Sequence, residues 1–272
     1  MSMISIITVN YNDANGLEET IKSVMAQTYR DYEHIVVDGD SSDGSKEIID
    51  KYRDKLSWAV SEPDNGIYHA MNKGIRASKG KYLLFLNSGD TLYNENVLDK
   101  TVEKLKPDHR IYYGDVLRIF ENGTSKIKTY PNELSFGFFV DSALAHQSVF
   151  IDRTLFDEIS FYDESYKVLA DWELLIRAIC VHHIPYKHLG IIVARYDMTG
   201  ISSQPEGKKI MFEERNRCYH EHFRLFWKDY RELMNYRLIF RSKQGRLFSK
   251  IEQKKVSRTL NYWFMKLLSK FI

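Results

Sequence analysis

The chain of 272 residues is poor in cysteine, in proline and in long apolar runs, and its net charge is small. Its two cysteines are too few for a disulfide scaffold or a four-thiolate zinc site, and they fit a reducing compartment. Five prolines and fourteen glycines argue against a long flexible linker. The N-terminus has neither the basic segment nor the apolar core of a signal peptide, and no run approaches about 18 apolar residues. We therefore expect a cytoplasmic protein without an ordinary transmembrane helix.

The net charge of +2 is a cancellation between two parts of the chain. Residues 205–272 contain 17 Lys and Arg against 7 Asp and Glu, whereas residues 1–204 contain 22 against 30. An acidic body thus precedes a basic tail. This split predicts a large domain over residues 1–204, followed by an extension that meets an anionic surface.

Short apolar runs alternate with helical patterns in the first third of the chain. The runs at 4–9, 34–37 and 82–86 are typical of buried strands, whereas 17–25 and 67–77 have the apolar spacing of helices. Strands separated by helices predict an α/β fold with a mostly parallel sheet flanked by helices. Because ligands in such folds bind beyond the carboxyl ends of the strands, the residues after each strand are the first candidates for a site.

The middle of the chain is less regular. A hairpin is predicted between 111–119 and 126–130, further strands at 149–151 and 191–196, and a helix at 171–181. From about residue 206 the pattern is helical, aromatic and basic to the end.

Polar side chains follow three of the predicted strands. Asn10 ends the first strand, Asp38 ends the second, and Asp90 closes the Asn-Ser-Gly-Asp turn after the strand at 82–86. Asp and Ser are common in turns, and Ser42 and Asp43 are interpreted as N-caps of the following helix. Asp38 and Asp90 each follow an apolar strand, where sites tend to be, so they are candidates for binding.

Four segments in order carry a resemblance to a known family. They are residues 4–45 (beginning ISIITVNYN), residues 61–90 (containing GIYHAMNKG and LNSGD), residues 146–151 (HQSVFI) and residues 162–178 (containing ADWE). Together they resemble family 2 glycosyltransferases, notably enzymes of bacterial surface-polysaccharide assembly such as the colanic-acid type. The resemblance implies a GT-A fold with a donor half over about 1–95 and an acceptor half over about 96–204. It also implies an inverting hexosyltransferase that uses a nucleotide-sugar, most often a UDP-sugar, and a divalent metal ion.

By this resemblance, the nucleotide-sugar lies against the strand ends of the donor half. Asp38 takes the position of the acid that accepts hydrogen bonds from the uracil or ribose, a task that suits an ionised carboxylate. Lys73 is interpreted either as a cation near the diphosphate or as a solvated lysine of its helix. The other residues that the resemblance assigns to the donor are Thr8, Asn10, Tyr11, Asp64, Asn72 and Ser88.

The turn Asn87–Asp90 stands where the family has its acidic metal-binding cluster. Mn²⁺ and Mg²⁺ take oxygen ligands, often one or two carboxylates together with substrate phosphates. Asn87 and Gly89 replace positions that are often Asp, which leaves Asp90 as the charged metal ligand. One carboxylate and two phosphates can suffice, and the ion would neutralise the departing diphosphate.

Asp171 matches the Asp of the family's Glu-Asp pair, and Ala170 stands in place of the Glu. The resemblance implies that Asp171 is the catalytic base, which takes the proton of the acceptor hydroxyl as that oxygen attacks the anomeric carbon. From its position alone, Asp171 is interpreted as a helix N-cap, and the two roles are compatible.

Further residues are assigned to the sugar or the acceptor. His146 and Gln147 are either a polar pair at a strand entry or contacts of the donor sugar or acceptor. Trp172 and Glu173 follow the base. Glu173 is a second candidate for the base, and is otherwise interpreted as a surface or acceptor-side residue. Arg195, with the loop 199–203, resembles a lid whose Arg clamps the diphosphate and whose closure excludes water.

The tail from 235 to 272 combines ten Lys and Arg with one acid, Glu252, and many large apolar residues. This mixture is typical of an amphipathic helix on an anionic membrane, where each basic residue contributes roughly 1 kcal/mol. The alternative is that the tail packs on the catalytic domain or on a second subunit in a homodimer. Nucleic acid is not expected, because the acidic body offers no companion motif.

These observations predict a peripheral enzyme at the inner face of the bacterial cytoplasmic membrane. Its acceptor would be a lipid-linked saccharide in the synthesis of a cell-surface polysaccharide. The competing hypothesis is a non-catalytic sugar-nucleotide-binding or scaffold protein of the same pathway. Its basis is the absence of carboxylates at Asn87, Gly89 and Ala170.

Overall fold

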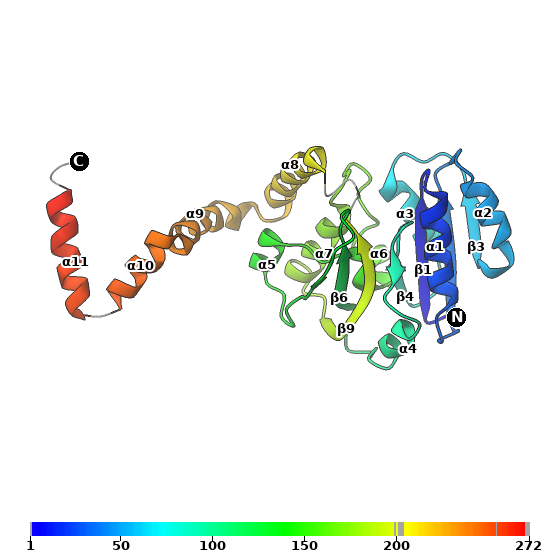
Figure 1. Cartoon of the computed structure of the whole chain (residues 1–272), viewed down its shortest axis with the longest axis horizontal. Coiled ribbons are helices and arrows are strands. Elements are labelled where there is room, and N and C mark those ends of the chain that lie inside the picture. The colour runs from blue at the N-terminus through cyan, green and yellow to red at the C-terminus, as the bar shows by residue number, and fades with distance from the viewer. Residues whose placement is uncertain (1, 199, 201–203, 254, 270–272) are drawn as a thin grey trace. The chain divides into compact units, whose positions relative to one another are not determined.

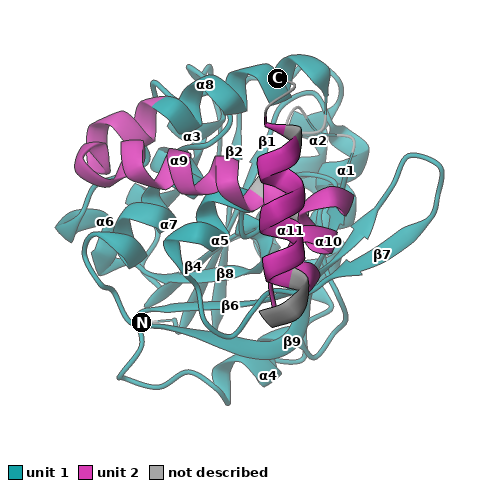
Figure 2. Ribbon diagram, turned by 90° about the vertical axis from the view of Figure 1, so that its left-hand side faces the viewer, with its two compact units in different colours: residues 1–216 teal, residues 217–272 magenta. Residues whose placement is uncertain are grey.

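A computed structural model describes residues 2–198, 200, 204–253 and 255–269. The chain divides into two compact units, Met1–Asn216 and Arg217–Ile272, coloured teal and magenta in Figure 2. The charge distribution in the sequence predicts a boundary between residues 204 and 205. In the structure, the first unit continues to Asn216, within helix α8 (Pro205–His222). The reason is that the carboxylate of Glu214, in the middle of α8, accepts hydrogen bonds from the backbone N–H groups of residues 167–169 and so ties this helix to the first unit.

The N-terminal half of the first unit is a parallel sheet. Its strands are β1 (Ile4–Asn10), β2 (Tyr32–Asp38), β3 (Trp58–Ser61) and β4 (Tyr82–Phe85), in the order β3-β2-β1-β4. The connecting helices are α1 (Ala14–Met25), α2 (Ser45–Lys51) and α3 (Ile67–Ala77), as Figure 1 shows. Every residue of β1 is buried, as expected for a strand covered on both faces. The strands and helices predicted in this half are confirmed, and α3 has the predicted bounds.

The second half of the sheet contains antiparallel pairs. Strand β8 (Val149–Asp152) runs antiparallel between β4 and β6 (Ile111–Ile119), and β6 pairs in parallel with β9 (Tyr186–Asp197). The short strand β5 (Thr91–Leu92) closes this edge on β9, and β7 (Ser125–Lys128) forms the predicted hairpin with β6. The remaining helices of this unit are α4 (Val97–Val102), α5 (Phe136–Asp141), α6 (Thr154–Glu158) and α7 (Ala170–Cys180), with 3-10 turns at Arg53–Lys55 and His146–Ser148.

Two expected helix caps differ in the structure. The N-cap of α2 is Gly44, whose φ of 100° lies in the left-handed region, and the Asp43 carboxylate instead accepts hydrogen bonds from the backbone and hydroxyl of Ser45. Helix α7 begins one residue before Asp171, and its N-cap is Leu169. The Asp171 carboxylate is therefore not used as a cap.

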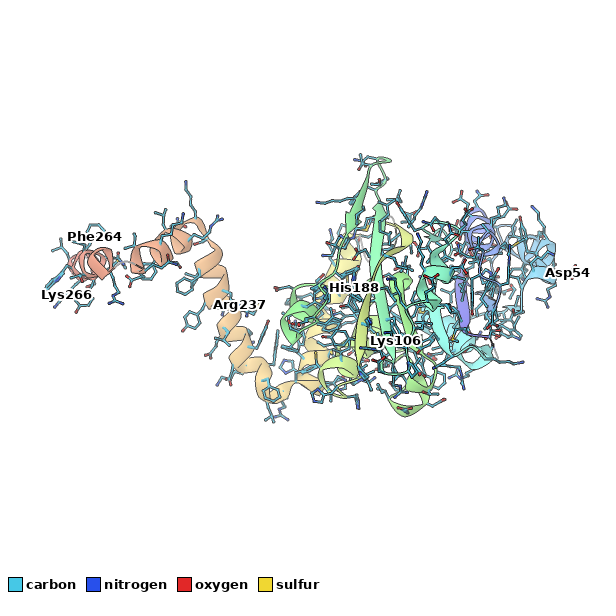
Figure 3. The ribbon with its side chains drawn as sticks, turned by 90° about the horizontal axis from the view of Figure 1, so that it is seen from below. Asp54, Lys106, His188, Arg237, Phe264 and Lys266 are labelled. Carbon is cyan, nitrogen blue, oxygen red and sulfur yellow. The ribbon has the colours of Figure 1, made fainter. Side chains whose placement is uncertain are left out.

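The second unit is helical, as the sequence predicts. Beyond the end of α8 it contains α9 (Arg224–Arg241), α10 (Lys243–Glu252) and α11 (Lys255–Leu268). Phe264 and Lys266 lie on α11, and Arg237 lies on α9 (Figure 3). Of the helices in the described part of the chain, none combines the length and the apolar character needed to span a bilayer.

Candidate active site

The carboxyl ends of β1 and β4 open into a cavity of about 700 Å³, here called the donor cavity. Its wall includes Asn10, Tyr11, Asp64 and Ser88, which are four of the residues that the resemblance assigns to the nucleotide-sugar. Tyr11 is 70% exposed, so its ring is available to stack against a flat ligand. The position of this cavity follows from the topology, because the carboxyl ends of neighbouring parallel strands meet at one edge of the sheet.

The backbone approaches the donor cavity closely at Gly39. A Cβ atom at this position would lie 2.7 Å from Asp64 Oδ2, so a larger residue would force the Asp64 carboxylate to move. Asp64 Oδ1 accepts a hydrogen bond from the Gly66 backbone at 2.8 Å, which holds that carboxylate in place. Gly39 and Asp64 therefore fix one side of the donor cavity.

Asp38, which is expected to contact the base or ribose, is not among the residues that line the donor cavity. Its side chain is fully buried, and its carboxylate accepts hydrogen bonds from Asn10 Nδ2 at 2.6 Å and from the hydroxyls of Ser41 and Ser61 at 2.5 Å. Burial opposes ionisation of Asp38, but these hydrogen bonds outweigh it and lower its pKa. Asp38 thus holds the turn after β2, and the neighbouring Asp40 lines the cavity in its place.

Four other residues assigned to the donor face elsewhere. Thr8 is buried with its hydroxyl 3.0 Å from His34 Nε2, and Asn72 is buried against Tyr162. Lys73 forms an ion pair with Glu62 at 2.8 Å, and the Arg195 guanidinium lies over the ring of Tyr93. The loop that was expected to act with Arg195 lies outside the described residues, except for Gly200.

A second cavity of about 660 Å³, here called the acceptor cavity, adjoins the first. The two cavities share Asp13, Ile67, Asn87 and Ser88 in their walls. The acceptor cavity is also lined by residues of β6, α7 and the start of α8, so both halves of the first unit contribute to it.

Asp171 lies in the wall of the acceptor cavity, and each of its oxygens has a donor. Tyr68 donates its hydroxyl to Oδ1 at 2.9 Å, and His146 Nδ1 lies 3.1 Å from Oδ2. The Asp171 side chain is 14% exposed. Since Asp171 stands in the first turn of α7, the positive end of the helix dipole also favours its negative charge. Asp171 is therefore a fixed, partly accessible carboxylate.

The other residues assigned to the sugar or acceptor divide into two groups. His146, Gln147 and Trp172 line the acceptor cavity, and Trp172 donates its indole N–H to the Phe139 carbonyl at 3.0 Å. Glu173 is neither at the surface nor in the wall of this cavity. It is buried on the other side of α7, where it forms an ion pair with Arg177 at 2.8 Å.

Comparison with known proteins decides the family. The sequence pattern of glycosyl transferase family 2 matches residues 5–169. The chain belongs to this family. An uncharacterized glycosyltransferase of Mycobacterium tuberculosis is 33% identical over 209 residues, which are 75% of this chain and 78% of that protein. A PGL/p-HBAD biosynthesis glycosyltransferase of Mycobacterium bovis is 31% identical over 204 residues, 73% of this chain and 78% of that protein.

Solved glycosyltransferase structures share the fold. Residues 1–349 of Staphylococcus aureus TarS in complex with UDP match with a TM-score of 0.60 at 18% identity, over 78% of this chain and 63% of that one. The chain therefore spans less than two thirds of the length of that structure. A Pyrobaculum calidifontis mannosyltransferase in complex with GDP-Man and Mn²⁺ matches with a TM-score of 0.57 at 14% identity, over 95% of this chain and 82% of that one. These likenesses confirm the GT-A fold.

Asp90 is the acidic residue of the turn Asn87–Asp90, which the family resemblance assigns to metal binding. It is 4% exposed; Gln147 Nε2 donates to its Oδ2 at 2.7 Å, and the Asp197 backbone donates to its Oδ1 at 3.0 Å. Burial raises the pKa of Asp90 to about 6, because these hydrogen bonds offset only part of the cost of desolvating its charge. A nearby cation would remove that cost.

The residues at this turn fit a metal ion that is held mainly by phosphate oxygens. Asn87 Oδ1 is buried and has no hydrogen-bond partner among the described residues, and it stands with Asp90 in the wall of the acceptor cavity. Both are oxygen donors, which Mn²⁺ and Mg²⁺ prefer. The part of the chain that the structure describes contains no group of three His, Cys, Asp or Glu that could hold a metal, so substrate oxygens would have to complete the coordination.

Three residues of this glycosyltransferase site were not singled out from the sequence. Asp13 caps α1 through Gly16 and lines both cavities, Tyr68 holds Asp171, and Arg118 of β6 lines the acceptor cavity. The cap signal at Asp13 is visible in the sequence, because an Asp precedes the apolar pattern of α1. Tyr68 and Arg118 depend on contacts with residues far along the chain.

Proposed function

We propose that this chain transfers a sugar from a UDP-sugar to a hydroxyl group of a saccharide acceptor, with inversion at the anomeric carbon. The observation that carries the proposal is the pair of adjoining cavities with a shared wall and an anchored carboxylate, Asp171, in the second one. A nucleotide in the donor cavity would present its sugar across this shared wall. The acceptor would approach from the other side.

The chemistry needs one carboxylate at the acceptor. As the acceptor oxygen attacks the anomeric carbon, its proton passes to Asp171, and the nucleoside diphosphate leaves from the opposite face with the electrons of the broken bond. No covalent intermediate forms, so the configuration inverts once. His146 lines the same cavity, and its buried Nε2 has no partner among the described residues, which suits a hydrogen bond with a sugar hydroxyl.

The donor assignment draws on two kinds of support. TarS has been solved with UDP and with UDP-GlcNAc, and the Pyrobaculum mannosyltransferase with GDP-Man and Mn²⁺. In this chain, Tyr11 and Asp64 line a cavity large enough for a nucleotide. A Mn²⁺ or Mg²⁺ ion at Asp90 and Asn87 would neutralise the charge of the departing diphosphate.

The decisive variant is Asp171→Asn. It keeps the size of the side chain and removes the proton acceptor, so transfer should fall by at least about 1,000-fold while UDP affinity stays within twofold. Transfer is measured with a panel of UDP-sugars and saccharide acceptors, and UDP binding by calorimetry. Substantial remaining transfer would remove Asp171 from the role of base.

A non-catalytic sugar-nucleotide-binding protein is the second candidate function. Its support is the absence of carboxylates at Asn87, Gly89 and Ala170, where the family resemblance leads us to expect acidic residues. Slow release of UDP from a UDP-sugar without acceptor supports the enzyme. Tight binding of a UDP-sugar, with neither hydrolysis nor transfer across the panel, supports the binding protein.

We further propose that the second unit holds the enzyme on an anionic membrane, at the inner face of the bacterial cytoplasmic membrane, where a lipid-linked acceptor would lie. Its described helices expose large apolar side chains beside basic ones. On α11, Leu260 is 66% and Trp263 61% exposed, and Lys266 Nζ lies 5.3 Å from the centre of the Trp263 ring. Apolar anchors with interleaved cations are typical of interfacial helices.

Liposome flotation tests this membrane proposal. On α10, Lys243, Arg246 and Lys250 lie at helical spacing on one face, so changing all three to Glu alters the charge and keeps the apolar residues. Binding to vesicles with anionic lipid should fall by at least tenfold in this variant. Equal binding of the native chain to anionic and neutral vesicles would contradict the proposal, and a concentration-dependent dimer in light scattering would favour packing between two subunits.

A further inference from the structure

The first turn of helix α3 borders both cavities. Gly66 and Ile67 line the donor cavity, whereas Ile67 and Tyr68 line the acceptor cavity. Successive residues of an α-helix point about 100° apart, so neighbouring positions of one turn can reach two adjoining spaces. Any movement of this turn would therefore change both walls together.

The Tyr68 side chain connects this turn to Asp171. Its hydroxyl donates to Asp171 Oδ1 at 2.9 Å, across 103 positions of the sequence. The Tyr68 ring is buried and packs against Tyr162, with ring centres 5.6 Å apart. Burial, together with the charge of Asp171, raises the pKa of Tyr68 well above its usual range. The hydroxyl therefore keeps its proton and acts as a permanent donor to the carboxylate.

A second set of contacts lies one helical turn further along the same face. Asn72 Nδ2 donates to the Tyr162 carbonyl at 2.9 Å and to Glu164 Oε1 at 2.8 Å, and the Tyr162 backbone donates to Asn72 Oδ1 at 3.1 Å. The segment 162–169 leads directly into α7, which carries Asp171. Helix α3 is thus hydrogen-bonded to Asp171 through Tyr68. Through Asn72 it is also hydrogen-bonded to the segment that precedes α7.

His146 completes the arrangement on the other oxygen of Asp171. Its Nδ1 lies 3.1 Å from Oδ2, so the two carboxylate oxygens have one donor each, from opposite halves of the first unit. Two donors fix the plane of the carboxylate. Each oxygen keeps a second lone-pair position, with which it can accept the proton of the acceptor.

We infer that Tyr68 is a positioning residue, which fixes the position of the Asp171 carboxylate relative to the donor cavity. This inference rests on the proposed function, in which Asp171 is the base. Tyr68 itself exchanges no proton. Its role is to hold the Asp171 carboxylate at a fixed place relative to the anomeric carbon of the bound sugar. A displacement of the carboxylate by about 1 Å can lower the rate about 100-fold.

The test compares two variants that each remove one hydroxyl from a buried tyrosine. Tyr68→Phe breaks the hydrogen bond to Asp171, whereas Tyr162→Phe changes the adjoining ring, which no described hydrogen bond joins to Asp171. We expect Tyr68→Phe to lower kcat by about 10- to 100-fold, with KM for the UDP-sugar and the affinity for UDP within twofold of the native values. Tyr162→Phe should keep kcat within threefold.

A kcat for Tyr68→Phe within threefold of the native value would overturn the inference. So would equal losses of kcat in the two variants, or a rise in KM at constant kcat, because these outcomes indicate general packing or donor binding.

A double variant separates this inference from the proposed function. In an Asp171→Asn background, Tyr68→Phe should lower the residual transfer no further, since its partner is already changed. A further tenfold loss would place the action of Tyr68 elsewhere and contradict the inference. Substantial transfer by Asp171→Asn alone would instead refute the base assignment.

Discussion

The raised pKa of Asp90 predicts that the native chain is less stable than it could be at neutral pH. Asp90 has a pKa of about 6 when folded, against an ordinary value of 3.8. The folded chain therefore binds its proton more tightly than the unfolded chain. By linkage, the free energy of unfolding falls as pH rises from about 4 to about 6, and the loss is complete at pH 7.5.

The magnitude follows from the two pKa values. A difference of about two units at 1.36 kcal/mol each corresponds to about 3 kcal/mol at neutral pH. Asp90→Asn removes the titration, and Gln147 can turn its amide to accept the new N–H while the Asn oxygen still accepts from the Asp197 backbone. At pH 4 the unfolded carboxyl is already partly ionised, so slightly less than this full value separates pH 4 from pH 7.5. In metal-free buffer, the stability gained by Asp90→Asn over the native chain should therefore be greater at pH 7.5 than at pH 4 by about 2.5 kcal/mol.

Urea unfolding between pH 4 and pH 7.5, with EDTA present, measures this difference. Asp50→Asn, at an exposed carboxyl, serves as the control for the loss of one negative charge. The same Asp90→Asn variant should lose the Mn²⁺-dependent part of UDP binding in calorimetry. A stability difference that does not change with pH would refute the argument about Asp90, and unchanged UDP affinity with Mn²⁺ would refute its role as a metal ligand.

Two further predictions concern the packing of the first unit. A Cβ atom at Gly80 would lie 2.6 Å from the Ser5 backbone nitrogen, so Gly80→Ala should lower the free energy of unfolding by about 1–3 kcal/mol. At Gly200 an added Cβ would meet no atom of the described residues within 4 Å, so Gly200→Ala should be nearly neutral in the same urea titration. Burial raises the pKa of the Cys180 thiol to about 11, so iodoacetamide at pH 8 should modify it about 100-fold more slowly than in the unfolded chain; equal rates by mass spectrometry would contradict this.

The strands and helices of the donor half could be predicted because their apolar residues follow simple periods. Ile67–Ala77 has the bounds expected from its helical spacing, and the run at 4–9 is contained in β1. The insertion of β8 between β4 and β6 could not be predicted, because these pairings join residues about 40 to 70 positions apart without a local signal. The two-residue strand β5 is too short for any period to show.

The sequence predicts where the candidate site lies better than it predicts which side chains face the cavities. Asp38 stands at a strand end, as expected, but whether its carboxylate faces the cavity depends on Ser61, 23 positions away, which donates to it. Asn72 likewise has a buried partner, Tyr162, 90 positions away, that no spacing rule identifies. Glu173 pairs with Arg177 at the i,i+4 spacing of its helix, but its burial on that face could not be predicted. Asp171 was identified through the family resemblance, and its contacts with Tyr68 and His146 became visible only in the folded chain.

The two cavities are lined by different segments of the chain, and this has a consequence for how their specificities can change. The donor cavity is lined entirely by residues between Val9 and Ser88, whereas the acceptor cavity also draws on residues as far along as Arg215. If the donor cavity binds the nucleotide, as proposed, the residues that recognise it come from one continuous third of the chain, and exchange of the segment 111–216 between relatives would leave that third intact. Recombination would therefore combine new acceptor cavities with an unchanged donor cavity, and the nucleotide bound by such chimeras should follow the N-terminal parent.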